Sequence, residues 1–140
     1  MFLIDTNVIS ELMRATPAPS VLSWFSTQDP STLYLSAVTE AELRTGIAIL
    51  PEGQRRKALK AALDATISED FEGRILPFDT DAAKAYAEIA AGRQSAGRPI
   101  AEADCQIAAI AREAAMPVIT RNTRDFEGCG IGLINPWDDQ

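Results

Sequence analysis

The sequence of 140 residues contains no histidine. This absence excludes Ser-His-Asp and Cys-His catalysis, zinc sites with histidine ligands and ribonuclease chemistry that uses a pair of histidines. Any chemistry must therefore come from carboxylates, hydroxyls, amides and basic side chains. Carboxylates without histidine favour hard metal ions, which prefer oxygen ligands.

Cysteine is nearly absent as well. Cys105 and Cys129 form no CxxC pair and lie far apart, so they support neither a disulfide framework nor a thiolate metal site, and we expect buried free thiols. Long apolar runs are also missing, so the sequence predicts no membrane span. Asp5 interrupts the apolar start, where a signal peptide stays uncharged. We therefore expect a single domain over residues 1–140, located in the cytoplasm.

Positive charge is scarce relative to negative charge. The chain has 13 Lys and Arg against 20 Asp and Glu, a formal net charge of −7. This balance weakens the case for a polyanionic ligand without excluding it. Most of the basic residues are arginine, which recognises phosphate with a planar fork that lysine lacks. Several lie close in sequence to acidic residues: Arg98 before Asp104, and Arg121 and Arg124 beside Asp125.

Five short apolar runs alternate with segments of helical period. The predicted strands are Phe2–Ile4, Leu33–Leu35, Arg74–Pro77, Val118–Thr120 and Gly132–Ile134. The predicted helices are Asn7–Met13, a segment that begins at Pro19, Val38–Leu50, Glu52–Phe71 as one long helix or a bent pair, Thr80–Ser95 and Ile100–Ala115. Strands that alternate with helices predict a three-layer α/β/α fold, with a parallel sheet covered on both faces.

Two acidic residues have both a functional and an ordinary interpretation. Asp5 directly follows the first strand and so lies at the carboxyl edge of the sheet, where open α/β folds bind ligands. Alternatively, Asp5 only caps a helix that begins at Thr6 or Asn7, two residues that are also candidates to support its carboxylate. Glu42 fits a capping box with Thr39 as N-cap. Its functional interpretation gains weight only together with the other acids.

Asp104 is the most informative of the acids. It lies within the apolar stripe of its helix, four residues after Ile100 and three before Ile107. A carboxylate on a buried face is costly unless it is paired or bound to a metal. Its place in the first helical turn offers a partial alternative through the helix dipole, but Glu102 can serve that purpose from the solvent side. A functional role is therefore favoured for Asp104.

Asp125 follows Asn122 by three residues, so Asn122 is a possible helix cap with Asp125 as its acidic partner. Thr120 and Asn122 are then either parts of a helix start or hydrogen-bonding groups that orient the acids. The recurrence decides between these interpretations, because four strand or helix ends each present an acid at the same sheet edge. We expect these carboxylates to form a cage of oxygen ligands for a metal that assists phosphodiester cleavage.

These segments together resemble the PIN-domain ribonucleases, most closely the VapC and FitB-like toxins of bacterial toxin–antitoxin pairs. The resemblance covers nearly the full length of the chain. The matching segments are Leu3–Val8, Glu42, Asp104–Ala109, Thr120–Phe126 and Asn135–Trp137. Each segment is modest alone, but their order and spacing make the resemblance specific.

The resemblance implies a PIN-like fold whose five-stranded parallel sheet has the order 3-2-1-4-5. It implies an endoribonuclease that depends on Mg²⁺, or alternatively Mn²⁺, and cleaves RNA with a metal-activated water. It also implies a homodimer and a cognate antitoxin, a small DNA-binding protein. The acidic quartet of the family maps onto Asp5, Glu42, Asp104 and Asp125, with Asp5 and Asp104 as the metal ligands.

Apolar surface and aromatic residues give two further expectations. The first two helices and Val38–Leu50 carry more apolar side chains than a small two-faced domain needs, which predicts a homodimer through some of these helices. Trp137 is expected to pin the C-terminal end of the chain.

Two other classes of function remain open. An aspartyl-phosphate phosphotransfer protein also places an acid after its first strand. Such a site needs a nearby lysine, whereas Lys57, Lys60 and Lys84 do not follow a late strand. A PIN module that only binds a partner, without nuclease activity, is the other alternative. For a nuclease, single-stranded or looped RNA is the expected substrate, because a duplex hides its bases.

Overall fold

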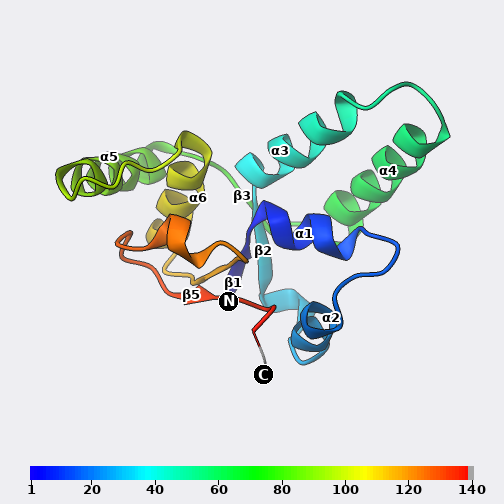
Figure 1. The fold of residues 1–140 in the computed structure, drawn as a ribbon, viewed down its shortest axis with the longest axis horizontal. Helices are drawn as coiled ribbons and strands as arrows, with labels where there is room; N and C mark the ends of the chain where they lie inside the picture. Colours follow the sequence, from blue (N-terminus) through cyan, green and yellow to red (C-terminus); the bar gives the residue numbers. More distant parts are fainter. Residues whose placement is uncertain (139–140) are drawn as a thin grey trace.

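The computed structural model describes residues 1–138, and its centre is a parallel sheet of five short strands (Figure 1). The strands are β1 (Phe2–Ile4), β2 (Leu33–Ser36), β3 (Ile75–Leu76), β4 (Val118–Ile119) and β5 (Leu133–Ile134). Their order across the sheet is β3-β2-β1-β4-β5, and every neighbouring pair is parallel. The predicted α/β class and the sheet order implied by the resemblance are confirmed.

Helices cover both faces of this sheet. The α-helices are α1 (Thr6–Leu12), α2 (Pro19–Ser26), α3 (Ala37–Ala48), α4 (Gln54–Ala65), α5 (Thr80–Ser95) and α6 (Glu102–Glu113). Shorter helical segments are η1 (Pro30–Thr32) and η3 (Thr123–Phe126), both 3₁₀, and η2 (Thr66–Asp70), which is π-helical. Figure 1 shows α5 and α6 on one side of the sheet and α1 to α4 on the other. Within residues 1–138 we find no helix with the length and apolarity that a membrane crossing requires.

Each face of the sheet has its own apolar core. Successive side chains of a strand point to opposite faces, so Leu3 of β1 packs with α5 and α6, whereas the next residue, Ile4, packs with the helices of the other side. Both are completely buried. Cys105 and Cys129 lie in the first core as free thiols, as predicted. Burial on both faces explains why the strands read as plain apolar runs without alternation.

The start of α3 differs from the prediction, and the difference frees Glu42. The N-cap is Ser36, whose hydroxyl accepts a hydrogen bond from the backbone N–H of Thr39 at 3.0 Å. The helix therefore begins before Val38–Leu50, the predicted range, and the capping box with Thr39 as N-cap is wrong. Ser36 ends β2 and caps α3 at once, so no loop separates the two elements. Glu42 consequently lies beyond the first turn, where no cap occupies its side chain.

The helix α6 is shorter at both ends than the predicted Ile100–Ala115. Ala101 has extended backbone angles, so the helix begins after it. At the other end Ala115 has a φ of 56°, in the left-handed region, and the N–H of Met116 donates to the carbonyl oxygen of Ala111 at 2.9 Å. This arrangement closes the last turn in the manner of a Schellman motif.

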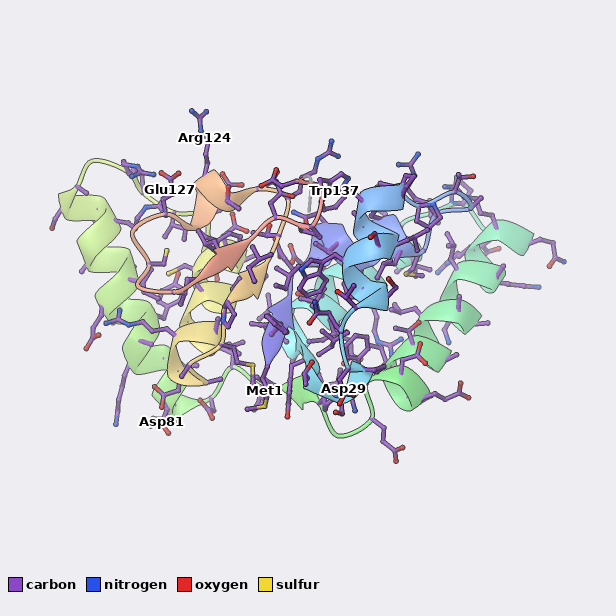
Figure 2. All side chains as sticks on the ribbon, turned by 90° about the horizontal axis from the view of Figure 1, so that it is seen from below. Met1, Asp29, Asp81, Arg124, Glu127 and Trp137 are labelled. Carbon is purple, nitrogen blue, oxygen red and sulfur yellow. The ribbon has the colours of Figure 1, made fainter. Side chains whose placement is uncertain are left out.

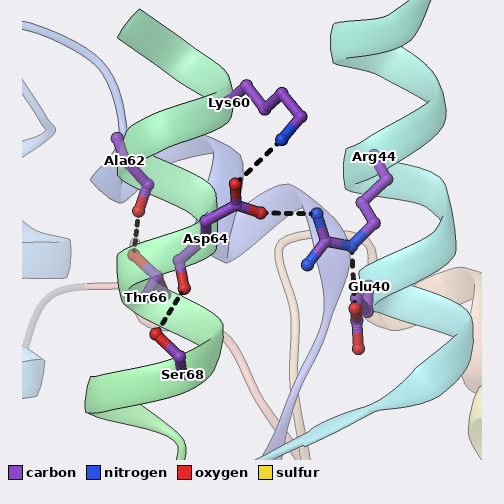
Figure 3. A network of polar contacts seen from close by, with 7 residues as sticks. All are labelled: Glu40, Arg44, Lys60, Ala62, Asp64, Thr66 and Ser68. Atoms are coloured by element: carbon purple, nitrogen blue, oxygen red, sulfur yellow. Dashed lines mark hydrogen bonds and ion pairs between the residues drawn. The ribbon is translucent and has the colours of Figure 1, made fainter.

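A network of ion pairs joins α3 to α4 (Figure 3). Arg44 donates to Glu40 on its own helix and to Asp64 on α4, each at 2.8 Å, and Lys60 donates to the other oxygen of Asp64 at 3.0 Å. The predicted segment Glu52–Phe71 is α4 followed without a break by η2. Arg44 therefore holds the two helices as one unit.

Candidate active site

The carboxyl ends of the central strands lie at one end of the molecule. Figure 2 shows Arg124 and Glu127, which mark η3 and its C-cap, together with Trp137 at this end. Met1 and Asp29, which precede β1 and β2, lie at the opposite end. The segments that follow β1, β4 and β5 therefore meet on one surface.

Asp5 follows β1 directly and is held by three hydrogen bonds. Its Oδ1 accepts from the backbone N–H of Thr6 at 2.8 Å, which makes Asp5 the N-cap of α1. Its Oδ2 accepts from the hydroxyl of Thr120 at 2.8 Å and from Nδ2 of Asn7 at 3.3 Å. Only 5% of the residue is exposed. Asp5 therefore caps a helix, as the ordinary interpretation predicted, and also presents an oriented carboxylate at the sheet edge, where the functional interpretation places it.

Thr120 connects the end of β4 to this carboxylate. It is completely buried, and its hydroxyl oxygen accepts from Nδ2 of Asn7 at 3.3 Å and from the backbone N–H of Asn122 at 3.1 Å while its proton goes to Asp5. Thr120 thus orients an acid, as one of the two interpretations proposed. Asn122 stands at the N-cap position of η3, but its side chain makes no capping hydrogen bond there, and it contributes its backbone amide to Thr120.

Glu42 reaches the same edge from α3. The hydroxyl of Thr6 donates to Oε1 of Glu42 at 2.6 Å and lies 3.1 Å from the hydroxyl of Thr39. Since the N–H of Thr6 already binds Asp5, this one residue links two of the four predicted acids. The exposed Glu42 is therefore part of the predicted cluster and does not cap its own helix.

Asp104 and Asp125 bring the remaining two carboxylates. Asp104 lies half-buried in the first turn of α6, and Asp125 is exposed on η3. The side chains of both are without a hydrogen bond or ion pair inside residues 1–138, which is the described part of the chain. η3 is a 3₁₀ turn, so the side chain of Asp125 does not serve as a capping partner.

Two of the four carboxylates, Asp104 and Asp5, have raised pKa values. Burial raises the pKa of Asp104 to about 6, and the negative charges of Asp5, Asp125 and Glu42 contribute to this rise. Burial also raises the pKa of Asp5, to which Glu42 and Asp125 add, although the hydrogen bonds that Asp5 accepts oppose the shift. The structure therefore brings all four acids into one electrostatic cluster, which we call the acid cluster.

Arg93 on α5 is a residue that the sequence analysis missed. Only 7% of it is exposed, and its guanidinium donates to three backbone carbonyl oxygens: Arg98 at 2.6 Å, and Asp125 and Glu127 at 3.0 Å each. The positive charge also lowers the pKa of Asp104 slightly against the larger opposing effects. These hydrogen bonds therefore hold the segment that carries Asp125 in place.

Comparison with known families explains this arrangement. Residues 2–129 match the sequence model of the family described as PIN domain. The chain belongs to the PIN-domain family. It is 46% identical over 138 residues to the VapC ribonuclease Y4jK of Sinorhizobium fredii, with 99% of each chain covered. It is 42% identical over 139 residues to the toxin FitB of Neisseria gonorrhoeae, with 99% of this chain and 100% of the relative covered.

The fold of this PIN domain also agrees with a solved structure. The structure of FitAB bound to an IR36 DNA fragment contains a chain that matches with a TM-score of 0.94 at 41% identity. The match covers 100% of this chain and 98% of the other. The resemblance described from sequence motifs is thereby confirmed over the full chain.

The donor atoms at the acid cluster of this PIN domain are all oxygens, which suits a hard cation. However, within residues 1–138 no group of three or more His, Cys, Asp or Glu side chains lies close enough together to hold a metal ion. The closed cage expected from the sequence is therefore not formed. Mg²⁺ usually keeps several waters and uses only one or two carboxylates. The oriented Asp5 and the donor-free Asp104 fit such a hydrated ion.

A groove of about 740 Å³ opens beside the acid cluster, between α1, α3 and α4. Sequence analysis gave no sign of it, because its walls come from three separate segments. Its lining includes two residues of the site, Thr6 and Glu42. The other lining residues are Ser10, Met13, Arg14, Ala15, Thr16, Leu43, Gly46, Ile47, Leu50, Arg55 and Leu59. The groove therefore leads from the sheet edge along the unit formed by α3 and α4.

Proposed function

We propose that this PIN domain is a metal-dependent endoribonuclease that acts as the toxin of a toxin–antitoxin pair. The observation that carries the proposal is the contrast between two acids of one cluster. Asp5 is fixed by three donors, whereas Asp104 has none among residues 1–138 and its pKa is raised to about 6. A carboxylate so destabilised in its charged form gains most from a cation. The names of the relatives, VapC ribonuclease and toxin FitB, support the reaction class.

The residues of the acid cluster then have separate tasks. Asp5 and Asp104 would hold the ion, with Asp5 kept in one orientation by Thr120 and Thr6. Glu42 and Asp125 would keep the site negative, which favours a divalent ion such as Mg²⁺ or Mn²⁺ over monovalent ions. When bound, the ion supplies a water of lowered pKa and positive charge near the scissile phosphate. No histidine is needed as a base in this arrangement.

Association with other chains is a second part of the proposal. The structure with a TM-score of 0.94 contains FitAB bound to DNA, which supports an antitoxin partner that is a small DNA-binding protein. A homodimer is also part of this proposal. Co-expression with the product of the adjacent reading frame should give a stable complex whose nuclease activity is suppressed. Free toxin activity in that complex would contradict the toxin–antitoxin assignment.

The nuclease proposal is tested with a labelled single-stranded RNA pool. We expect cleavage with Mg²⁺ or Mn²⁺, none with EDTA, and loss of cleavage in Asp104→Asn. Glu102→Gln is the matched control, because Glu102 is an exposed acid of the same first helical turn. This variant should cleave like the parent. Cleavage that resists EDTA would refute the metal mechanism. A protein that binds its partner but cleaves no RNA would instead be a partner-binding PIN module.

A further inference from the structure

Arg121 lies directly beside the hydrogen bonds that hold Asp5. It follows Thr120, and its backbone N–H donates to Oδ1 of Asn7 at 3.3 Å, while Nδ2 of the same Asn7 donates to Asp5. On the other side, the carbonyl oxygen of Arg121 accepts from Nδ2 of Asn135 at 3.3 Å. The main chain of Arg121 is therefore fixed on both sides at the border of the acid cluster.

The side chain of Arg121 is braced by Trp137. The guanidinium carbon lies 4.9 Å from the centroid of the indole ring, within the range of a cation–π interaction. Trp137 packs its other parts against the core cluster that contains Ile4, and its backbone N–H donates to Oδ1 of Asn135 at 2.9 Å. Trp137 therefore packs on the core, as expected, and holds the last described part of the chain, residues 135–138. The same indole also holds one face of the Arg121 guanidinium.

The guanidinium of Arg121 has no carboxylate partner among residues 1–138. The guanidinium is exposed and forms no ion pair within residues 1–138. It contributes to the lowered pKa of Glu11, but the main cause of that shift is the hydrogen bond from the N–H of Ala18, and Arg14 already pairs with Glu11. The positive charge of Arg121 is therefore available to a ligand that approaches the acid cluster.

An RNA strand meets a specific electrostatic problem at this site. In the proposed nuclease, the scissile phosphate would lie beside the negative charges of the acid cluster, and a bound ion would compensate charge only at that point. The neighbouring phosphate of the same strand needs a cation at the border of the acid cluster. An arginine suits this task because its planar fork donates two parallel hydrogen bonds to a phosphate, and weak hydration of the guanidinium favours contact.

We infer that Arg121, braced by Trp137, binds the phosphate next to the scissile phosphodiester of a single-stranded RNA. The inference rests on the proposed nuclease function and adds the residue that places the substrate. It is a substrate-binding role, so it should affect KM far more than kcat. The brace makes it specific to arginine, because lysine has a point charge without a planar face.

The test measures binding of a fluorescent single-stranded oligoribonucleotide in the inactive Asp104→Asn background, as a function of salt. Adding Arg121→Gln should weaken binding about tenfold, the loss expected for one charged hydrogen-bonded contact. It should also reduce the slope of log K against log salt by about 0.7, the value for one phosphate contact on a single strand. Arg121→Lys should retain the slope with weaker binding, and Trp137→Ala should give a smaller loss than Arg121→Gln.

Arg112→Gln is the matched control, since it removes the same charge from the far end of α6, where Arg112 pairs with Glu88. Its binding and salt slope should equal those of the background. In the active protein, Arg121→Gln should raise KM about tenfold with kcat within about twofold. If Arg121→Gln and Arg112→Gln had equal RNA binding and equal salt slopes, the inference about Arg121 would be overturned and the nuclease proposal would be unaffected. RNA cleavage by Asp104→Asn would refute the nuclease site, whereas the binding measurement would still report on Arg121.

Discussion

Replacing Asp104 with asparagine removes one charge from the acid cluster and keeps the shape of the side chain. We expect the metal-free variant to be more stable than the parent at neutral pH. The carboxyl has a pKa of 3.8 in its ordinary state, which the folded surroundings raise to about 6. Between these values the folded state binds more protons than the unfolded state, so the parent loses stability as pH rises from about 4 to about 6. Asparagine does not titrate, so the Asp104→Asn variant does not lose this part of its stability as the pH rises.

The size of the effect follows from the pKa shift. A rise from 3.8 to about 6 corresponds to at most about 3 kcal/mol at pH 7. Asp104 is only half-buried, and solvent screening reduces the expected gain to about 1–2 kcal/mol. For a domain of this length the gain raises Tm by about 3–6 °C. Near pH 4 the folded carboxyl is protonated and the unfolded carboxyl only about half ionised, so the two proteins should differ little in stability.

Urea denaturation in EDTA between about pH 4 and pH 8 measures this difference. The difference in unfolding free energy between variant and parent should increase as the pH rises and stay constant above about pH 6.5. Glu102→Gln should show no such pH-dependent difference from the parent. With Mg²⁺ added, the parent should gain more in Tm than Asp104→Asn, because the variant has lost a ligand. A variant less stable than the parent at pH 7, with an unchanged response to Mg²⁺, would refute the reasoning and leave Asp104 as a helix-dipole acid.

Three further predictions concern the hydrogen bonds and surfaces around the site. Thr120→Val removes the donor to Oδ2 of Asp5, and we expect a loss of about 1–3 kcal/mol in urea denaturation together with a large loss of cleavage. Arg93→Met leaves three carbonyl oxygens without their buried donor, so unfolding free energy should fall by about 3 kcal/mol, and Arg93→Lys should restore part of it. Light scattering at micromolar concentration should report a homodimer, to which the exposed Leu22 (46%) and Ile49 (77%) near α2 and the end of α3 contribute apolar surface. Double replacement of Leu22 and Ile49 by serine should weaken the dimer, and a monomeric parent would contradict this.

Local sequence was enough for the parts of the fold that depend on burial. Leu3 and Ile4 are buried on opposite faces, so their run is apolar throughout and predicts a strand in a covered sheet. The sheet order came only from the family resemblance, because no local pattern records which strands become neighbours. The start of α3 was misplaced because Ser36 belongs to both a strand and a cap, and the sequence pattern of Thr39 and Glu42 imitates a capping box.

The acid cluster was predicted residue by residue, but its supports were found only in part. Thr120 was named as an orienting group, whereas the buried Arg93 was overlooked. The signal was present, because Ala82, Ala85, Ile89 and Arg93 share the buried face of α5. The same stripe argument that singled out Asp104 would have selected Arg93. Its partners are backbone carbonyls of a distant segment, and carbonyls carry no sequence signature, so the direction of its hydrogen bonds was not accessible.

Asp5 caps α1 and accepts the hydroxyl of Thr120 in addition to its proposed role in chemistry, whereas the role proposed for Asp104 is chemical alone. Substitutions at Asp5 remove the N-cap of α1 and the hydrogen bond from Thr120, which joins the ends of β1 and β4. A variant inactivated at Asp5 should therefore also have a less stable fold. Substitution of Asp104 by asparagine should, on the proposed function, abolish cleavage and relieve repulsion at the same time. Selection for abundance alone would therefore erase Asp104 before Asp5. A persistent Asp104 in populations of this chain would be a record of continued selection for activity.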